Sequence, residues 1–339
     1  MSRARWVSLA ALLSIVAVGA AGFREWSACQ QALIQPVGGA APLIYEIEPG
    51  TPLAHVAEDF ARNGWVPRAL YVQFAAWKAD LSKRLQAGAY EVLPSDTPFS
   101  LLQKFAAGRV KEYELTWPEG IRFVDMLKLL AAAPGVTQTL GKATPEEILQ
   151  RAAEIQGAPE GWFYPDTWRY RHRTTDLELL TRAHRKLRQV LDQAWATRVE
   201  DRTLKTPYEA LILASIVEKE TAVEAERAQI AGVFLRRLQK GMKLQTDPTV
   251  IYGMGEAFNG NLTRADLLAD NPFNTYTRHG LPPTPICAPS ASSLRAVLHP
   301  APGDALYFVA RGDGTHVFSA TLAAHNAAVR EFQQKAARP

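Results

Sequence analysis

Two glutamates follow an apolar run in the middle of the chain. The run Leu211–Val217 contains no charged residue, and Glu218 comes directly after it. In a helix, Glu218 lies one turn beyond Ala214, on a stripe that faces a core or a cleft. Burial there would raise the pKa of the carboxyl group, and a carboxylic acid that keeps its proton near neutral pH can act as a general acid. Glu218 is therefore a candidate catalytic acid.

The same pattern has a second explanation, in which the helix reaches the surface at Glu218 and its charges are solvated. Glu220 shares a stripe with Leu213 and Val217, so helical periodicity does not choose between the two acids. By itself, the run predicts a buried helix and leaves the role of both carboxyl groups open.

Three later segments are rich in proline, amide side chains and aromatic rings: Leu244–Gly253, Asn271–Tyr276 and Gly280–Ile286. We expect proline-stiffened loops, which suit a preorganised site for a ligand rich in hydroxyls and amides, such as an amino sugar. Rigid loops that pack on a core have the same composition. Asp247 precedes Pro248 and should therefore leave helical geometry, which makes it a candidate second carboxylate or a turn former.

The composition restricts the class of protein. The 339 residues are 47% apolar and 21% charged, which is close to a soluble globular average and argues against disorder or a polytopic membrane protein. The net charge of +4 is too small to predict a nucleic-acid partner. Two cysteines, Cys29 and Cys287, cannot form a disulfide framework or a cysteine-based zinc site. We predict no metal and no cofactor.

The amino terminus carries a candidate membrane anchor at residues 6–23. This stretch of 18 residues is uncharged and would reach about 27 Å as a helix, close to the hydrocarbon thickness. Arg3 and Arg5 precede it, so we expect residues 1–5 to form a cytoplasmic tail and the remaining chain to be exported. A signal peptide cleaved after Ala20 is the alternative. Trp26 stands where a lipoprotein would have an aliphatic residue before Cys29, which argues against lipidation.

The exported chain has α+β character. Residues 24–42 are predicted as a linker, and 43–110 as a small subdomain with the order strand, two helices, strand and helix. The expected elements are strands at 44–47 and 88–92 and helices through 56–60, at 67–77 and at 95–107. The first four resemble a LysM module, a fold that binds amino-sugar glycans in other proteins. A small spacer domain without a ligand is the alternative.

Residues 111–335 are predicted as a larger mixed α+β domain. It should begin with a strand at 113–117 and continue in amphipathic helices to about residue 240. An apolar strand at 305–310 and a second at 315–319 flank Arg311-Gly312-Asp313-Gly314, which predicts a β-hairpin.

Four motifs together resemble the signature series of the YceG-like endolytic murein transglycosylases. They are Ala214–Thr221, Gln245–Gly253, Asn274–Tyr276 and Gly280–Pro283, in the family's order and spacing. Further resemblance lies in Glu160-Gly161, Pro165–Thr167, Leu298–Pro300, Tyr307–Ala310 and His325-Asn326. Phe273 departs from the family's usual Tyr, and Cys287–Ser290 departs from its usual turn. The resemblance covers the chain from the anchor to about Val329.

The resemblance implies a single-pass inner-membrane protein whose amino terminus is cytoplasmic and whose bulk is periplasmic. It implies a lyase that cuts peptidoglycan strands internally, between N-acetylmuramic acid and N-acetylglucosamine, and leaves 1,6-anhydromuramic acid ends. Such cleavage would terminate the elongation of nascent strands, so the implied partners are glycan strands, the membrane and peptidoglycan synthases of the penicillin-binding class.

The family's catalytic glutamate corresponds to Glu218 by this resemblance. Gln245, Asp247, Asn274 and Tyr276 become candidates for holding the sugar and stabilising positive charge on its ring. Four aromatic residues are candidates for stacking on sugar faces or for the core: Trp162, Phe163, Tyr164 and Trp168. Two other functions stay open, a non-catalytic glycan-binding scaffold tethered to the membrane and a muramidase in which Asp247 activates water.

Overall fold

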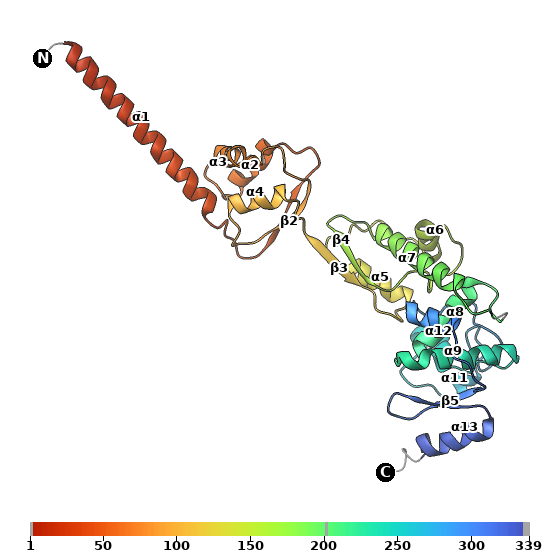
Figure 1. Cartoon of the computed structure of the whole chain (residues 1–339). Helices are drawn as coiled ribbons and strands as arrows, with labels where there is room; N and C mark the ends of the chain where they lie inside the picture. Colours follow the sequence, from red (N-terminus) through yellow and green to blue (C-terminus); the bar gives the residue numbers. More distant parts are fainter. Residues whose placement is uncertain (1–2, 201–202, 335–339) are drawn as a thin grey trace. The chain divides into compact units, whose positions relative to one another are not determined.

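The computed structural model describes residues 3–200 and 203–334, and the chain forms two compact units. Unit 1 extends to Tyr113 and unit 2 begins at Glu114. Each unit contains both helices and strands (Figure 1), so the predicted α+β class is confirmed.

Unit 1 begins with one long helix. Its elements are α1 (Arg3–Ile34), β1 (Leu43–Ile47), α2 (Leu53–Arg62), α3 (Ala69–Lys78), β2 (Gly88–Val92) and α4 (Pro98–Ala106). Within α1, Leu12–Ile34 is long and apolar enough to cross a membrane. The helix continues into the segment predicted as a linker, over residues 24–34, because the first helix-breaking residue after Gly22 is Pro36.

The rest of unit 1 packs around a two-stranded sheet. Strands β1 and β2 pair antiparallel, with Leu43 opposite Val92 and Ile47 opposite Gly88. Aromatic rings fill the space between this sheet and the helices, and the ring of Tyr45 stacks on that of Phe105 with centroids 5.4 Å apart. The order strand, helix, helix, strand agrees with the sequence prediction.

Unit 2 contains the remaining elements. They are β3 (Glu112–Thr116, which starts at the boundary), α5 (Phe123–Ala132), α6 (Pro145–Ala153), β4 (Thr167–Arg171), α7 (Asp176–Ala196), α8 (Pro207–Glu220), α9 (Glu224–Gln239), α10 (Asp247–Met254), η1 (Gly255–Ala257), α11 (Arg264–Leu268), α12 (Ala291–Leu298), β5 (Tyr307–Ala310), β6 (His316–Ser319), α13 (Leu322–Val329) and η2 (Arg330–Gln334). Strands β3 and β4 pair with each other (Figure 1). Strand β4 interrupts a region predicted as helical.

Helix α8 forms the centre of unit 2. Every residue from Ala210 to Val217 is buried, since α8 packs against α7, α9 and α12. The hydroxyl of Thr206 caps its first turn by accepting the Glu209 N–H at 3.2 Å. The apolar run is thus a helix buried on all sides, which ends where the two glutamates begin.

The predicted hairpin near the carboxyl terminus is present. Strands β5 and β6 pair antiparallel with Tyr307 opposite Ser319 and Ala310 opposite His316. Helix α13 follows and packs against both strands.

One predicted loop is a helix. Residues from Asp247 onward form α10, with Thr246 as the residue before its first turn. Pro248 lies in that first turn, where the N–H that proline lacks would have no partner within the helix. The expectation that Pro248 keeps Asp247 out of helical geometry is therefore wrong, and Asp247 is exposed.

Candidate active site

Glu218 and Glu220 lie in the last turn of α8 and point to different sides. Residues two apart in an α-helix are separated by about 200° around its axis. The two carboxyl groups therefore meet different neighbours, although both end the same buried helix.

The Glu218 carboxylate is held in a closed network of donors. Its Oε2 accepts the N–H of Ser290 at 2.9 Å and the Ser290 hydroxyl at 2.5 Å. Its Oε1 accepts Nη2 of Arg227 at 3.3 Å, and the two charged side chains are 5% and 11% exposed. Arg227 also donates to the hydroxyl of Ser292. This network joins α8 to α9 and to the start of α12.

The Glu220 carboxylate lies at a cavity of about 510 Å³. The hydroxyl of Thr246 donates to its Oε2 at 2.7 Å. The cavity is lined by residues from many segments of unit 2: Glu220, Arg237, Leu244, Gln245, Asp247, Tyr276, Tyr307, Phe308, Val309, Ala310, His316, Leu322, His325, Asn326, Val329 and Gln333. Three of the four predicted sugar-binding residues therefore share a cavity with Glu220.

The surroundings of Glu220 favour its protonated form. Burial raises the pKa of its carboxyl group, and the negative charge of Asp247 raises that pKa further. The hydrogen bond from Thr246 and the charges of His316 and Arg237 act in the opposite direction without cancelling the rise. A buried carboxyl that tends to keep its proton and faces a cavity has the properties of a general acid.

Asp247 and Tyr276 form a pair on the wall of this cavity. The phenol of Tyr276 donates to Oδ1 of Asp247 at 2.5 Å. Burial and this hydrogen bond raise the pKa of the Tyr276 phenol, so the hydroxyl keeps its proton and acts as the donor. Gln245 precedes the pair with a φ of 52°, a left-handed conformation that is uncommon for a residue other than glycine. Its N–H donates to the Thr275 carbonyl at 3.1 Å.

Asn274 does not line the cavity. It is 1% exposed, and its Nδ2 donates to the carbonyls of Asp266, Leu267 and Ala269. Its Oδ1 accepts the N–H of Tyr276 at 2.9 Å. Asn274 thus uses both ends of its amide to fold the loop that carries Tyr276, and the structure does not bring it onto the cavity wall with the other three predicted sugar-binding residues.

The far wall of the cavity comes from the carboxyl-terminal hairpin and α13, which sequence reasoning did not include in the site. His316 Nδ1 lies 2.7 Å from Oε2 of Glu226, and this pair ties β6 to α9. Arg237 donates from Nε to the Leu306 carbonyl at 2.6 Å. The ring of His325 stacks on that of Tyr307 with centroids 5.3 Å apart.

His325 carries an unused polar atom at this wall. Its Nδ1 is buried and has no hydrogen-bond partner among the described residues. Burial lowers the pKa of the imidazole, which favours the neutral ring. The motif His325-Asn326 was the available sequence signal for this wall, but nothing local in the sequence places it opposite Glu220.

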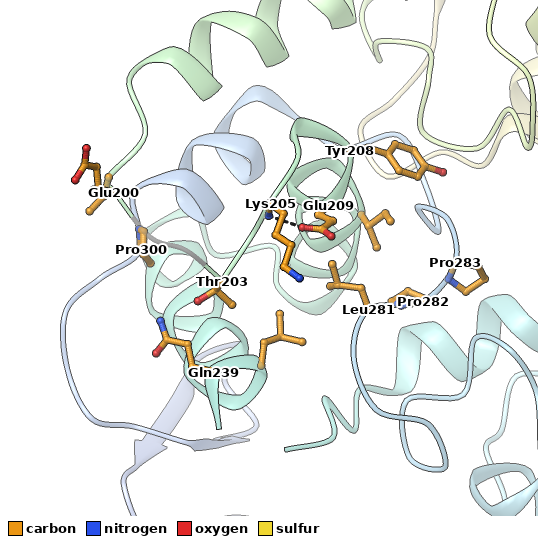
Figure 2. Close-up of a pocket in the computed structure, with 13 residues that line it drawn as sticks. Glu200, Thr203, Lys205, Tyr208, Glu209, Gln239, Leu281, Pro282, Pro283 and Pro300 are labelled. Carbon is orange, nitrogen blue, oxygen red and sulfur yellow. Dashed lines mark hydrogen bonds between the residues drawn. The ribbon is translucent and has the colours of Figure 1, made fainter. Parts of the chain in front are cut away.

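A larger cavity of about 1000 Å³ lies at the other end of α8 (Figure 2). It contains the motif residues Leu281, Pro282 and Pro283, together with Tyr208 from the first turn of α8. Figure 2 shows Lys205 beside Glu209, whose carboxylate accepts the Lys205 N–H at 2.5 Å. The last residue of α8 that lines this cavity is Ile212, and about 12 Å of helix separates it from Glu220. We therefore place the candidate active site at the 510 Å³ cavity.

Comparison with known proteins identifies the family. A profile of the YceG-like family matches residues 45–331, which is most of the chain. The chain belongs to the YceG-like family.

Curated relatives of this YceG-like chain are named endolytic murein transglycosylase. An endolytic murein transglycosylase of Bacillus subtilis (strain 168) is 28% identical over 321 residues, covering 89% of this chain and 88% of that protein. A protein of the same name from Streptococcus pneumoniae (strain D39) is 27% identical over 297 residues, and the match covers 78% of this chain. The match spans only 53% of the length of that relative.

A solved structure supports the fold of this YceG-like chain. The crystal structure of a YceG-like protein from Listeria monocytogenes matches with a TM-score of 0.52 at 26% identity. The match covers 85% of this chain and 99% of that one.

The four aromatic residues that were candidates either for stacking on sugar or for the core lie outside the candidate cavity. Phe163 is 1% exposed and stacks on Phe123 at a centroid distance of 5.2 Å. Trp162 stacks on Tyr208 at 5.2 Å with an angle of 9° between the rings. Tyr164 packs on the core, and Trp168 lies beneath the guanidinium of Arg182. Core packing accounts for Phe163 and for most of the surface of Trp162 and Tyr164.

Proposed function

We propose that this YceG-like protein is an endolytic peptidoglycan lytic transglycosylase. It cleaves the bond between N-acetylmuramic acid and N-acetylglucosamine within a glycan strand and leaves a 1,6-anhydromuramic acid end. The names of its relatives support this class of reaction. The observation that carries the proposal is a buried carboxyl, Glu220, facing a cavity that also holds Asp247 and Tyr276.

We assign the proton transfers to Glu220 in place of Glu218. Glu220 protonates the glycosidic oxygen as the bond to the anomeric carbon breaks, and the 6-hydroxyl of the muramic acid attacks that carbon. The Glu220 carboxylate then accepts the proton of the 6-hydroxyl, so the enzyme returns to its starting state without water entering the product. Asp247 faces the same cavity and stabilises the positive charge that develops on the sugar ring.

Glu218 serves this site as a positioning residue. Its contacts with Arg227 and Ser290 fix the last turn of α8 against α9 and α12. The three hydrogen bonds to its carboxylate come from protein donors, and its side chain is 5% exposed. A proton carrier must reach the substrate, and Glu218 does not line the cavity that would hold it.

Internal cleavage requires a site that is open on both sides of the scissile bond. A second cavity of about 500 Å³ is lined by Lys219, Pro248 and Tyr252 among other residues. Lys219 and Pro248 are chain neighbours of Glu220 and Asp247, which line the first cavity. We propose that a glycan strand crosses the start of α10 and occupies both cavities.

Isotope labelling tests the reaction class. Purified glycan strands are digested by the full-length enzyme in ¹⁸O-labelled water, and the ends are analysed by mass spectrometry. The lyase proposal predicts anhydro ends without heavy oxygen. Heavy oxygen at a new reducing end would instead mark a muramidase, a second candidate that the presence of Asp247 and Glu220 on one cavity favours. If the folded protein forms neither product, it is instead a non-catalytic scaffold that binds glycan.

The proposed function also includes the membrane topology of the chain and a role for unit 1. We propose that α1 is an uncleaved single-pass anchor in the inner membrane with a cytoplasmic amino terminus, and that residues after it are periplasmic. The order strand, helix, helix, strand within residues 43–110 supports a LysM-like glycan-binding role. Peptidoglycan synthases are the proposed protein partners. Amino-terminal sequencing that finds a mature protein beginning after Ala20 would contradict the anchor.

A further inference from the structure

Helix α3 in unit 1 exposes a stripe of large apolar side chains. Leu70, Phe74 and Trp77 are 65%, 37% and 71% exposed. Their spacing places them on one face of the helix, and we call these three residues the α3 face. Contiguous exposed apolar groups on a folded protein mark a surface that contacts another phase or molecule.

The α3 face lies beside the carboxyl-terminal turns of α1. Arg68 Nη1 donates to Oε1 of Glu25 at 2.6 Å, and the Tyr71 phenol donates to the same oxygen at 2.8 Å. Further along, Leu33 of α1 is 5% exposed and belongs to the core of unit 1. Helix α3 therefore starts at the level of Glu25 and follows α1 toward its end.

An apolar groove of about 350 Å³ separates α1 from α3 and α4. It is lined by Gln30, Leu33, Ile34, Phe74, Ala75, Lys78, Ala79 and Phe99. Lys78 is the charged residue among these and is exposed, whereas Ile34 is 69% exposed at the end of α1. The groove thus combines apolar walls with an ammonium group at its rim.

We propose that the α3 face lies in the headgroup layer of the membrane that α1 spans, with a lipid phosphate at Lys78. Helix α1 has 32 residues, more than the about 20 that cross the hydrocarbon, and the headgroup layer adds about 5 to 8 Å on each side. The charged pair of Glu25 and Arg68 marks where α1 leaves the hydrocarbon. Trp77 and Lys78 are residue types that favour this layer.

The inference rests on the proposed anchor, because α1 determines how close α3 lies to the lipid. The anchor is also the reason why we favour a lipid over a sugar or a protein as the molecule that contacts the α3 face. The stripe from Leu70 to Trp77 covers about 10 Å of helix, a little more than the headgroup layer of about 5 to 8 Å, so Leu70 and Phe74 lie within the layer and Trp77 lies at its outer edge. A lipid contact here would give unit 1 a fixed face toward the membrane.

The test uses the full-length protein in liposomes with spin-labelled phospholipids. Leu70→Cys and Trp77→Cys are labelled with an environment-sensitive fluorophore, and the native Cys29 and Cys287 are buried. Glu58→Cys is the matched control, since Glu58 is exposed on α2 of the same unit. Val18→Cys reports whether α1 is inserted. We expect severalfold stronger lipid quenching at positions 70 and 77 than at position 58.

Each other outcome has one meaning. Quenching at position 18, with positions 70 and 77 quenched no more than 58, would overturn the lipid contact and leave the anchor standing. No quenching at position 18 would overturn the anchor and the lipid contact together. If glycan strands alter the emission at position 77 while lipid does not quench it, the α3 face is a sugar-binding surface and the inference is wrong.

Discussion

The two sides of the last turn of α8 differ in the groups that meet a glutamate there. On one side, Glu218 meets the guanidinium of Arg227 and two donors of Ser290. On the other side, Glu220 meets one hydroxyl, a nearby carboxylate and a cavity. Burial alone does not distinguish them, because both carboxyl groups are largely removed from water.

The difference shows which property marks a proton carrier. A carboxylate whose oxygens are both occupied by protein donors holds elements together, as Glu218 holds α8, α9 and α12. A carboxyl that keeps its proton and faces a cavity can give that proton to a ligand. Substitution of each carboxyl group separates these two roles.

The largest effect is expected for Glu220→Gln. An amide occupies the same volume and keeps a hydrogen bond with Thr246, but it cannot donate and then accept a proton. Turnover should fall by at least about 10²- to 10⁴-fold, because both proton transfers use this residue. The measurement is the release of anhydro ends from purified glycan, with circular dichroism to confirm folding. Activity within about tenfold of wild type would show that Glu220 is not the proton carrier.

Asp247→Asn should have the next largest effect. Removal of a charge that faces the developing cation would raise the barrier by about 2 to 4 kcal/mol, with anhydro ends still the only product. The variant should also change the pH profile. Asp247 raises the pKa of Glu220, and the acid must be protonated, so activity should be lost at a lower pH in the variant. If the variant loses activity at the same high pH as wild type, the charge of Asp247 does not raise the pKa of Glu220.

Glu218→Gln should affect stability more than chemistry. The variant leaves the charge of the buried Arg227 without a partner, which typically costs about 3 to 5 kcal/mol. Thermal unfolding should therefore shift to a lower temperature, while the folded variant keeps turnover within about tenfold of wild type. Arg227→Gln combined with Glu218→Gln provides the double-mutant cycle, and the second substitution should recover part of the loss. Loss of turnover without loss of stability would return the catalytic role to Glu218.

Glu160 offers a third buried carboxyl, which separates burial from catalysis. It is 6% exposed and accepts the Phe123 N–H at 3.0 Å and the Tyr252 phenol at 3.2 Å. Burial raises its pKa to about 7 from an ordinary value of 4.5. Because the native state binds this proton more tightly, the stability it adds is complete below the unfolded pKa and is lost as the pH rises through about 7.

Among the four substitutions, we expect the smallest effect for the one at Glu160. Glu160→Gln should flatten the decline in unfolding free energy between about pH 5 and about pH 8, by at most about 3 kcal/mol. Denaturant titrations across this range measure it, with the wild type as control. An identical decline in the variant would assign the pH dependence to other groups.

The elements that were predicted well depend on local patterns. Strand β2, helix α8 and the β5–β6 hairpin each follow from apolar spacing or turn residues within a short stretch. Strand β4 was missed although Trp168 and Tyr170 alternate with exposed residues, because it has only five residues and lies between helical segments. Helix α10 was mistaken for a loop because proline in a first helical turn has the same composition as a stiff loop.

The choice between the two glutamates could not come from the sequence. Periodicity places each of them on an apolar stripe, and the groups that distinguish them are distant in the chain. Ser290 reaches Glu218 from a segment 72 residues away, and Thr246 reaches Glu220 from 26 residues away. The wall formed by His316 and His325 is also brought to the site by tertiary packing alone.

The most direct test of the assignment is a structure of the Glu220→Gln variant with a glycan oligomer bound. The account predicts that the scissile oxygen lies within about 3.2 Å of the side chain at position 220, with the sugar ring beside Asp247. It also predicts that Glu218 keeps its contacts with Arg227 and Ser290 in the complex. A scissile oxygen bound at Glu218 instead, with its contact to Arg227 broken, would contradict the account.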